Sequence, residues 1–430
     1  MEIKKELQKA TILHQQGNLD EAQKIYNEIL NTEPNFAEAH HNLGILLKSL
    51  NKLNEAEKSF AKAISLKPNF IISHYQMGNT KYKLQKFEES EYHYKKAISI
   101  KSNFFEAYIN LGRAQRELRK LRESEESLRN AKKINPNHHE VNSLLGLILF
   151  DRGRFNDELK QQNLDKLSEG KEILLKSIEI KPDYAFTYLN LGLVYQELGE
   201  LDEAKKSYEK SLELEPSNVS AKYNLSILLS QIHFLEIIGY KNSKNILKEK
   251  KSIYKFNKEP FISSLKFEKN LIDLLYKINS TELNKTKSGP LFGIGKTSDY
   301  QLFDGKDKIL ENVKKNLIEL IEKETKSKVY FMDSFFNILG AGGGSVPHHH
   351  LNSFDTNFNL DKQKFSLTYY LSVGDQDCYE PGIFKLYNPS DEILPSNEMV
   401  MIIPSSRKHS AVYGGKKDRL MIGVNFYLYS

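Results

Sequence analysis

Residues Asn35 to Pro68 read NFAEAHHNLGILLKSLNKLNEAEKSFAKAISLKP, and the spacing of this 34-residue stretch is repeated through the first half of the chain. A fixed interval of this length predicts an array in which each unit is one supersecondary structure stacked on the next. The positions that keep the interval are Gly44, Gly78, Gly112 and Gly146; Tyr26, Phe60, Tyr94 and Leu128; Ala63, Ala97 and Ala131; and Pro34 with Pro68.

The array continues beyond Gly146 after one irregularity. Pro182 and Pro216 again keep the period, whereas the interval from Pro136 to Pro182 is longer than one period. The surplus lies near residues 156–170, and we expect it between the two helices of the fifth unit. Six units then end near Asn218, and a capping helix over about 219–232 completes a predicted helical superhelix over residues 1–235.

The fullest units have Leu-Gly in the first half, Glu-Ala followed by an aromatic residue in the second, and proline at the end, as in Leu43-Gly44, Glu55-Ala56 with Phe60, and Pro68. Small residues let two helices approach closely, bulky ones fill the neighbouring gap, and proline ends the second helix. This pattern resembles the tetratricopeptide repeat (TPR). The resemblance implies a superhelix whose concave groove binds a protein or an extended peptide.

The same resemblance places the residue two before each Leu-Gly glycine in the groove. An amide side chain there can pair with a peptide backbone, or it can join neighbouring helices, and the sequence leaves both readings open. The predicted groove residues are Asn42, Gln76, Asn110, Asn190 and Asn224, interrupted by Leu144, together with Tyr75, Tyr82 and Arg113.

The period changes in the second half of the chain. Residues 236–260 are charged and predict a connector, and helical patterns follow over 267–278 and 307–324. Alternating, β-rich runs come next: VYFMDSFFNILG, FSLTYYLSV, GIFKLYN, EMVMIIP and DRLMIGVNFYLY. We therefore predict an α+β multidomain chain in which residues 261–430 form an antiparallel sandwich or jelly roll with flanking helices.

Four of the twelve histidines lie in this β-rich half: His348, His349, His350 and His409. His348 and His350 are two positions apart, so on a strand both would point to one face and could bind one metal ion. His409 follows a later apolar strand, and Arg419 opens the last one.

The ordered motifs GAGGGSVPHHH, LTYYLS, GIFKLYNP, IPSSRKH and DRLMIGVNF, over residues 335–426, resemble the 2-oxoglutarate- and Fe(II)-dependent oxygenases with a His-x-His pattern. The resemblance implies a double-stranded β-helix (jelly roll) with Fe(II) and 2-oxoglutarate as cofactors. It makes His348, His350 and His409 the metal ligands, and Arg419 and Tyr370 the partners of the cosubstrate carboxylate. Asn425, on the same side of its strand as Arg419, would line the pocket.

One residue departs from the common oxygenase pattern. His350 stands where most members of the family carry Asp or Glu, which would leave a neutral ligand set around the iron. Asp355, in the segment that follows, is the alternative third ligand, and the sequence alone does not exclude it.

Together the two resemblances predict a hydroxylase whose TPR groove recruits a protein or peptide substrate. Two alternatives remain. One is a non-catalytic TPR scaffold with a degenerate jelly roll, and the other is a metal-dependent enzyme of cupin type that uses no keto acid. The sequence leaves the substrate, the hydroxylated atom and the oligomeric state open.

The composition excludes several other classes of protein. Hydrophobic residues make up 39% and charged residues 27%, as in ordinary globular proteins. A single cysteine, Cys378, excludes a disulfide framework, and the net charge of +6 comes from interleaved signs without the basic stripe of a nucleic-acid binder. No apolar run is long enough to span a membrane as a helix, and we expect a cytoplasmic protein with neither a nucleic acid nor a membrane as partner.

Overall fold

The computed structural model describes residues 2–154, 160–240, 259–268, 270–283, 291–292, 294–298 and 301–429. The chain forms two compact units: Met1–Glu197 with Asp202–Asn224, and Leu198–Leu201 with Leu225–Ser430. Most of the predicted connector over residues 236–260 lies outside the described residues.

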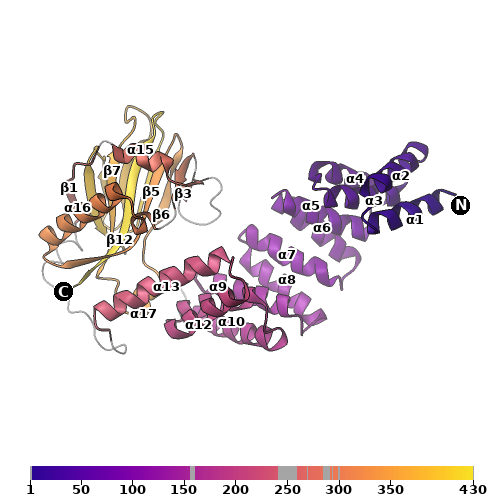
Figure 1. The fold of residues 1–430 in the computed structure, drawn as a ribbon, viewed down its shortest axis with the longest axis horizontal. Helices are drawn as coiled ribbons and strands as arrows, with labels where there is room; N and C mark the ends of the chain where they lie inside the picture. Colours follow the sequence, from indigo (N-terminus) through magenta and orange to yellow (C-terminus); the bar gives the residue numbers. More distant parts are fainter. Residues whose placement is uncertain are drawn as a thin grey trace. The chain divides into compact units, whose positions relative to one another are not determined.

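The N-terminal unit is helical, as predicted (Figure 1). Successive helices pair within each repeat, and neighbouring repeats then pack through their helices. The helices are α1 (Glu2–Gln15), α2 (Leu19–Thr32), α3 (Ala37–Ser49), α4 (Leu53–Leu66), α5 (Ile71–Lys83), α6 (Phe87–Ile100), α7 (Phe105–Glu117), α8 (Leu121–Ile134), α9 (His139–Arg154), α10 (Lys160–Ile180), α11 (Ala185–Glu197), α12 (Leu201–Leu214) and α13 (Val219–Ile237).

The repeated glycines are required by close helix packing within each unit. A Cβ atom added at Gly44 would lie 2.7 Å from the ring of Phe60, and one at Gly192 would lie 2.5 Å from the ring of Tyr208. In both cases the bulky partner comes from the next helix along the chain, α4 or α12. In the fifth unit Gly146 meets Leu174 of α10, and the insertion falls between these two contact points.

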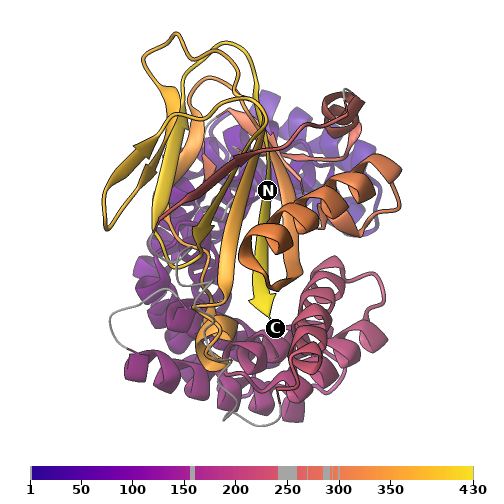
Figure 2. The same cartoon turned by 90° about the vertical axis from the view of Figure 1, so that its left-hand side faces the viewer.

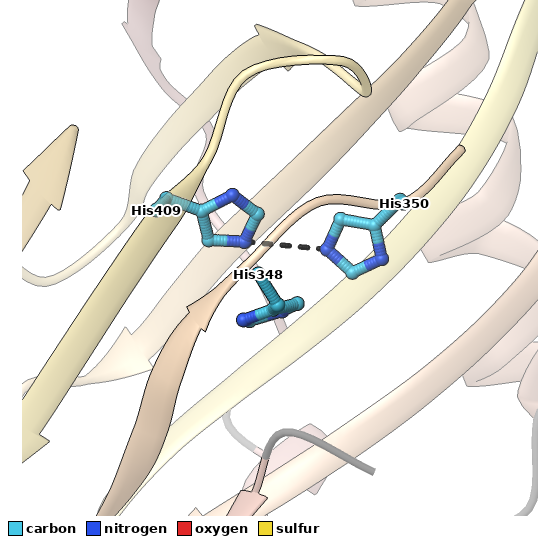
Figure 3. Close-up of side chains that lie close together, drawn as sticks. All are labelled: His348, His350 and His409. Atoms are coloured by element: carbon cyan, nitrogen blue, oxygen red, sulfur yellow. Dashed lines mark hydrogen bonds between the residues drawn. The ribbon is translucent and has the colours of Figure 1, made fainter. Parts of the chain in front are cut away.

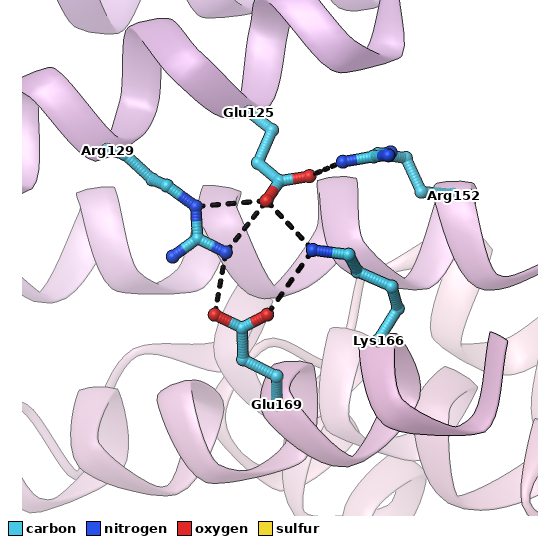
Figure 4. Close-up of polar contacts among 5 residues, drawn as sticks. All are labelled: Glu125, Arg129, Arg152, Lys166 and Glu169. Atoms are coloured by element: carbon cyan, nitrogen blue, oxygen red, sulfur yellow. Dashed lines mark hydrogen bonds and ion pairs between the residues drawn. The ribbon is translucent and has the colours of Figure 1, made fainter. Parts of the chain in front are cut away.

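The surplus residues were expected between the two helices of the fifth unit, but many of them belong to the second helix, α10. The helix α10 has 21 residues, whereas the second helices of most other units have 14. Residues 155–159 lie outside the described part. The longer α10 is held by an ion cluster in which Glu125 of α8 accepts from Arg129, Arg152 and Lys166, while Glu169 also pairs with Arg129 and Lys166 (Figure 4).

The helix α13 is longer than the predicted cap and is divided between the two units at Asn224 and Leu225. Its last turns belong to the C-terminal unit, where Phe234 stacks on Tyr427 with ring centroids 4.4 Å apart. The predicted superhelix runs to residue 235, whereas this aromatic packing joins the second half of the helix to the β-rich unit.

The C-terminal unit contains two antiparallel sheets. The larger has the strand order β1-β10-β7-β12-β5-β4-β2, and the smaller has the order β3-β6-β11-β8-β9. The strands are β1 (Phe261–Ser264), β2 (Thr281–Glu282), β3 (Leu291–Phe292), β4 (Gly295–Thr297), β5 (Lys328–Leu339), β6 (Gly343–His348), β7 (Lys364–Ser372), β8 (Pro381–Leu386), β9 (Asp391–Ile393), β10 (Met399–Pro404), β11 (His409–Tyr413) and β12 (Arg419–Tyr429).

The two faces of the larger sheet pack differently. Its outer face forms the main core with the helices α15 (Asn270–Lys277) and α16 (Lys308–Thr325), for example through Leu317 and Ile422. Figure 2 shows α16 running alongside β12, which is drawn in yellow. Its inner face meets the smaller sheet, where Tyr370, Met401 and Phe384 share one apolar cluster. This inner space contains the candidate site.

The five predicted β-rich runs correspond to β5, β7, β8, β10 and β12, and both predicted helices are present as α15 and α16. The other strands were not among the predicted runs, because most of them are short, and glycine and histidine dominate β6. Within the described residues, no helix combines the length and apolar character that a bilayer crossing requires.

The glycine packing leads to a stability test. We expect Gly192→Ala to lower the free energy of unfolding by about 1–3 kcal/mol, because the new methyl group overlaps the Tyr208 ring. Gly305→Ala is the control, since a Cβ there meets no atom within 4 Å. Chemical denaturation of the full chain measures both. Equal stability of the two variants would contradict the packing role of the repeated glycine.

Candidate metal centre

Three imidazoles converge at one rim of the smaller sheet (Figure 3). His348 ends β6 and His409 begins β11, and the two are direct partners in the antiparallel ladder. His350 lies in the loop after β6, so its approach depends on the path of that loop and not on strand alternation, as the sequence analysis had assumed. One ligand nitrogen from each residue lies within 4.8 Å of the others.

The spacing of two of these nitrogens is close to that of neighbouring ligands around one metal ion. The Nε2 atoms of His350 and His409 are 3.2 Å apart. Two nitrogens at about 2.1 Å from a metal and at right angles to each other would be about 3.0 Å apart. The three rings thus present a set of donors to one point, although Asp355 is not among them.

Burial keeps two of these rings in the neutral form that binds metals. It lowers the pKa of His409 to about 4, with a further contribution from His348. Burial, followed by His409 and His348, also holds the pKa of His350 well below its ordinary value. A neutral imidazole has one nitrogen with a free lone pair.

The backbone fixes which nitrogen of His409 is free. Its Nδ1 lies 3.1 Å from the carbonyl oxygen of Arg407, which can only accept a hydrogen bond. We therefore assign the proton to Nδ1 and leave the Nε2 lone pair directed at the other two histidines. The ring also stacks on Phe384 at a centroid distance of 5.0 Å.

Asp355, the alternative ligand, has a different role. It is fully buried, and its carboxylate caps the short helix α17 (Ser353–Asn357) by accepting from the backbone N–H of Asn352 at 2.7 Å. The hydroxyl of Tyr427 and the ammonium of Lys364 donate to the same carboxylate, the latter at 2.8 Å. With its oxygens engaged in this way, Asp355 anchors the segment after His350.

Lys364 connects this anchor to the histidine loop. Its ammonium group donates to the His350 carbonyl at 2.8 Å as well as to Asp355, and its side chain is only 3% exposed. The backbone N–H of His350 donates to the carbonyl of Ser405 at 2.8 Å. His350 is thus held on both sides of its α-carbon by buried groups.

A cavity extends from the histidines between the two sheets. It offers about 80 Å³ to water-sized groups, several times the roughly 10–15 Å³ that one water requires by the same measure. Its polar wall residues include Asn337, Tyr370 and Asn425. Among the described residues, the buried Oδ1 of Asn337 has no hydrogen-bond partner.

Arg419 is buried, as a carboxylate partner would be, but it does not line this cavity. Its guanidinium donates to the carbonyls of Val373 at 3.2 Å and Gly382 at 2.6 Å, and to that of Pro381. The group lies 5.9 Å from the centre of the Tyr370 ring. The prediction thus identified a buried cation beside Tyr370, while its contacts are with backbone oxygens.

Asn425 lines the cavity, and its hydrogen bonds lead to polar residues that were not predicted from the sequence. Its amide donates to Asp333 at 2.7 Å, and its oxygen accepts from Ser366 at 2.7 Å. Burial raises the pKa of Asp333 to about 6, against the lowering effect of Lys364. Asp333 and Asn337 are polar residues four apart in a largely apolar strand, and this irregularity was the available signal.

The predicted groove amides mostly join neighbouring helices. Asn42 donates to Thr11 at 3.2 Å, and Asn190, which is 1% exposed, donates to Ser143 at 3.2 Å. The remaining contacts in this set are Gln76 with Lys48 and Asn79, Asn110 with Tyr75 and Asn79, Arg113 with Asn110 and Glu140, and Tyr82 with Phe87; Asn224 is half-buried. These contacts favour the packing reading over a free amide ladder.

Comparison with known proteins identifies the helical unit. Sequence models of the tetratricopeptide repeat match residues 7–36, 37–70, 105–138 and 185–218, and a TPR repeat model matches residues 78–118. No curated protein sequence matches the chain.

Several solved structures are similar to part of the chain. YrrB, a TPR protein with an unusual peptide-binding site, is 20% identical, covers 46% of this chain and 96% of its own, and has a TM-score of 0.39. MamA is 24% identical over 44% and 94%, with a TM-score of 0.37, and PilF of Pseudomonas aeruginosa is 15% identical over 52% and 96%, with a TM-score of 0.43. The predicted repeats are confirmed: the N-terminal helices of this chain are tetratricopeptide repeats.

Proposed function

We propose that the C-terminal unit is a 2-oxoglutarate- and Fe(II)-dependent dioxygenase that hydroxylates its substrate, and that the TPR groove recruits a protein or peptide. The observation that carries the proposal is the convergence of His348, His350 and His409 within 4.8 Å at the mouth of a cavity. When bound, the iron would couple two oxidations by O2: one oxygen atom would enter a substrate C–H bond as a hydroxyl group, and the other would enter succinate as 2-oxoglutarate loses CO2.

The strand order supports a double-stranded β-helix for this unit. Going along the chain from β5 to β12, four strands join the larger sheet in the order β10-β7-β12-β5, and four join the smaller in the order β6-β11-β8-β9. This alternation of sheets is that of a jelly roll. It brings the end of β6 and the start of β11 together, which is where the metal ligands are needed.

The residues fit a divalent iron. Imidazole nitrogen is an accepted ligand for Fe(II), and three ligands on one side leave positions for a bidentate keto acid. In the cavity, the hydroxyl of Tyr370 is placed to donate to a carboxylate of 2-oxoglutarate. Two hydrogen bonds orient the ligands. The Arg407 carbonyl accepts from the His409 ring, and the Lys364 ammonium donates to the His350 carbonyl.

Joining a binding array to this unit would raise the concentration of a captured partner near the histidines.

A non-catalytic TPR scaffold is the second candidate function. It is favoured by the three backbone carbonyls that occupy Arg419, because they give this side chain a structural role without any cosubstrate.

Metal binding tests the ligand assignment. We expect His348→Ala, His350→Ala and His409→Ala each to weaken Fe(II) binding by at least tenfold under anaerobic conditions, since each removes one of three ligands. His349→Ala is the matched control from the same loop, and it should bind like the wild type. Absence of iron binding by the wild type would favour the scaffold. If only His349→Ala lost Fe(II) binding, the assignment of the three ligands would be wrong.

Cosubstrate binding tests the role of Tyr370. We expect Tyr370→Phe to raise the KM for 2-oxoglutarate about 10- to 100-fold in assays of succinate formation, because a hydrogen bond to a charged group contributes about 1.5–3 kcal/mol. Tyr369→Phe is the control on the same strand, since its hydroxyl donates to the Leu265 carbonyl at 2.7 Å and its loss should leave this KM unchanged. Succinate formation with identical KM values in both variants would exclude the proposed contact.

A further inference from the structure

A crevice opens at the rim of the smaller sheet, which also carries the histidines. It lies between Tyr387, Asn388 and Pro389, which follow β8, and the segment from Pro404 to Lys408, which precedes β11. It offers about 280 Å³ to water-sized groups. None of the described residues that line it is acidic, and two are basic, Arg407 and Lys408.

The two walls of this crevice are tied directly to the metal-binding residues. The backbone N–H of Tyr387 donates to the Lys408 carbonyl at 3.0 Å, and the Tyr387 hydroxyl is 2.9 Å from the Ser410 hydroxyl. Arg407 accepts from His409 through its carbonyl, and Ser405 accepts from the backbone of His350. The segment from Pro404 to Lys408 therefore contacts two of the three histidines, His350 and His409.

Arg407 is an unusual residue in this setting, because it is only 8% exposed and has almost no partners. Its Nη2 donates to the Pro389 carbonyl at 2.8 Å, and this is the hydrogen bond that its guanidinium makes within the described residues. Its Nε is buried without an acceptor. Asp391 is close enough to act on it electrostatically, but the two form no ion pair in the described structure.

Other buried cations of this unit are compensated. Lys364 has the carboxylate of Asp355, and Arg419 has three carbonyl oxygens. A buried charge that is neither paired nor fully hydrogen-bonded costs free energy, and proteins rarely keep one. The exception in this comparison is the arginine that lines an open crevice.

We propose that this crevice binds an oxyanion, a carboxylate or phosphate group, with Arg407 as its principal partner. A planar guanidinium with free N–H groups can donate two parallel hydrogen bonds to such a group. The exposed side chains of Lys408 and Ser406 line the same crevice and add a second positive charge and a hydroxyl. The assignment of this anion to the hydroxylated substrate rests on the proposed function, and it makes that substrate an anionic one.

The test is direct anion binding by the full chain, with inorganic phosphate and acetate as probes and chloride at equal ionic strength as the reference. A probe at ten times its Kd should raise the melting temperature by about 3–6 °C in calorimetry. Arg407→Met should lose this shift without a lower melting temperature in chloride, because the variant removes an unpaired charge. Lys385→Met, an exposed lysine on β8, should keep the shift.

A measurement on the wild type makes the test independent of how the variant folds. The Nε–H resonance of Arg407 should move during the same titration. A shift with phosphate alone assigns a phosphate group, and one with acetate alone assigns a carboxylate. The inference is wrong when neither probe moves the resonance, or when Arg407→Met keeps the thermal shift.

Anion binding in the crevice can be tested separately from the proposed dioxygenase function. His348→Ala should keep the anion shift, since this histidine does not line the crevice; a shift lost in this variant would assign the anion to the metal and overturn the inference. Iron binding without an anion effect leaves the dioxygenase proposal standing alone. An anion effect in a chain that binds no iron keeps the crevice and removes the substrate assignment.

Discussion

The buried ion pair between Lys364 and Asp355 is the interaction on which the candidate centre depends. Lys364 begins β7, Asp355 caps α17, and the pair also holds the Tyr427 hydroxyl and the His350 carbonyl. Removing one partner of a buried pair typically costs about 3–5 kcal/mol, because the other charge is left without compensation. The pair therefore fixes the one histidine of the three that lies on a loop.

The two units are stabilised by contacts of different sequence range. In the TPR unit, contacts are local, and each glycine accepts the bulky side chain of its own repeat, as Gly44 does with Phe60. The lengthened fifth unit needs more than this, and the ion cluster around Glu125 supplies it. In the C-terminal unit, the contacts join distant segments: β12 lies between β5 and β7, and its register brings Asn425 opposite Asp333.

Three buried cations of the C-terminal unit illustrate how one residue type serves different purposes. Lys364 is neutralised by a carboxylate and positions a loop, whereas Arg419 is satisfied by carbonyls beside the Tyr370 ring. Arg407 keeps unused donors at a crevice. Sequence patterns drew attention to Arg419 only, since the partners that distinguish these cations come from other parts of the chain.

The sequence by itself determined the repeat array, since a 34-residue period of small and bulky positions records contacts made within one unit. It also determined five of the strands, through alternation, and the identities of the three histidines. Only the tertiary structure decided that His350 reaches the others from a loop, that Asp355 anchors that loop, and that half of α13 belongs to the β-rich unit. These features depend on contacts between residues far apart in the chain, such as Phe234 with Tyr427, and local patterns carry no record of them.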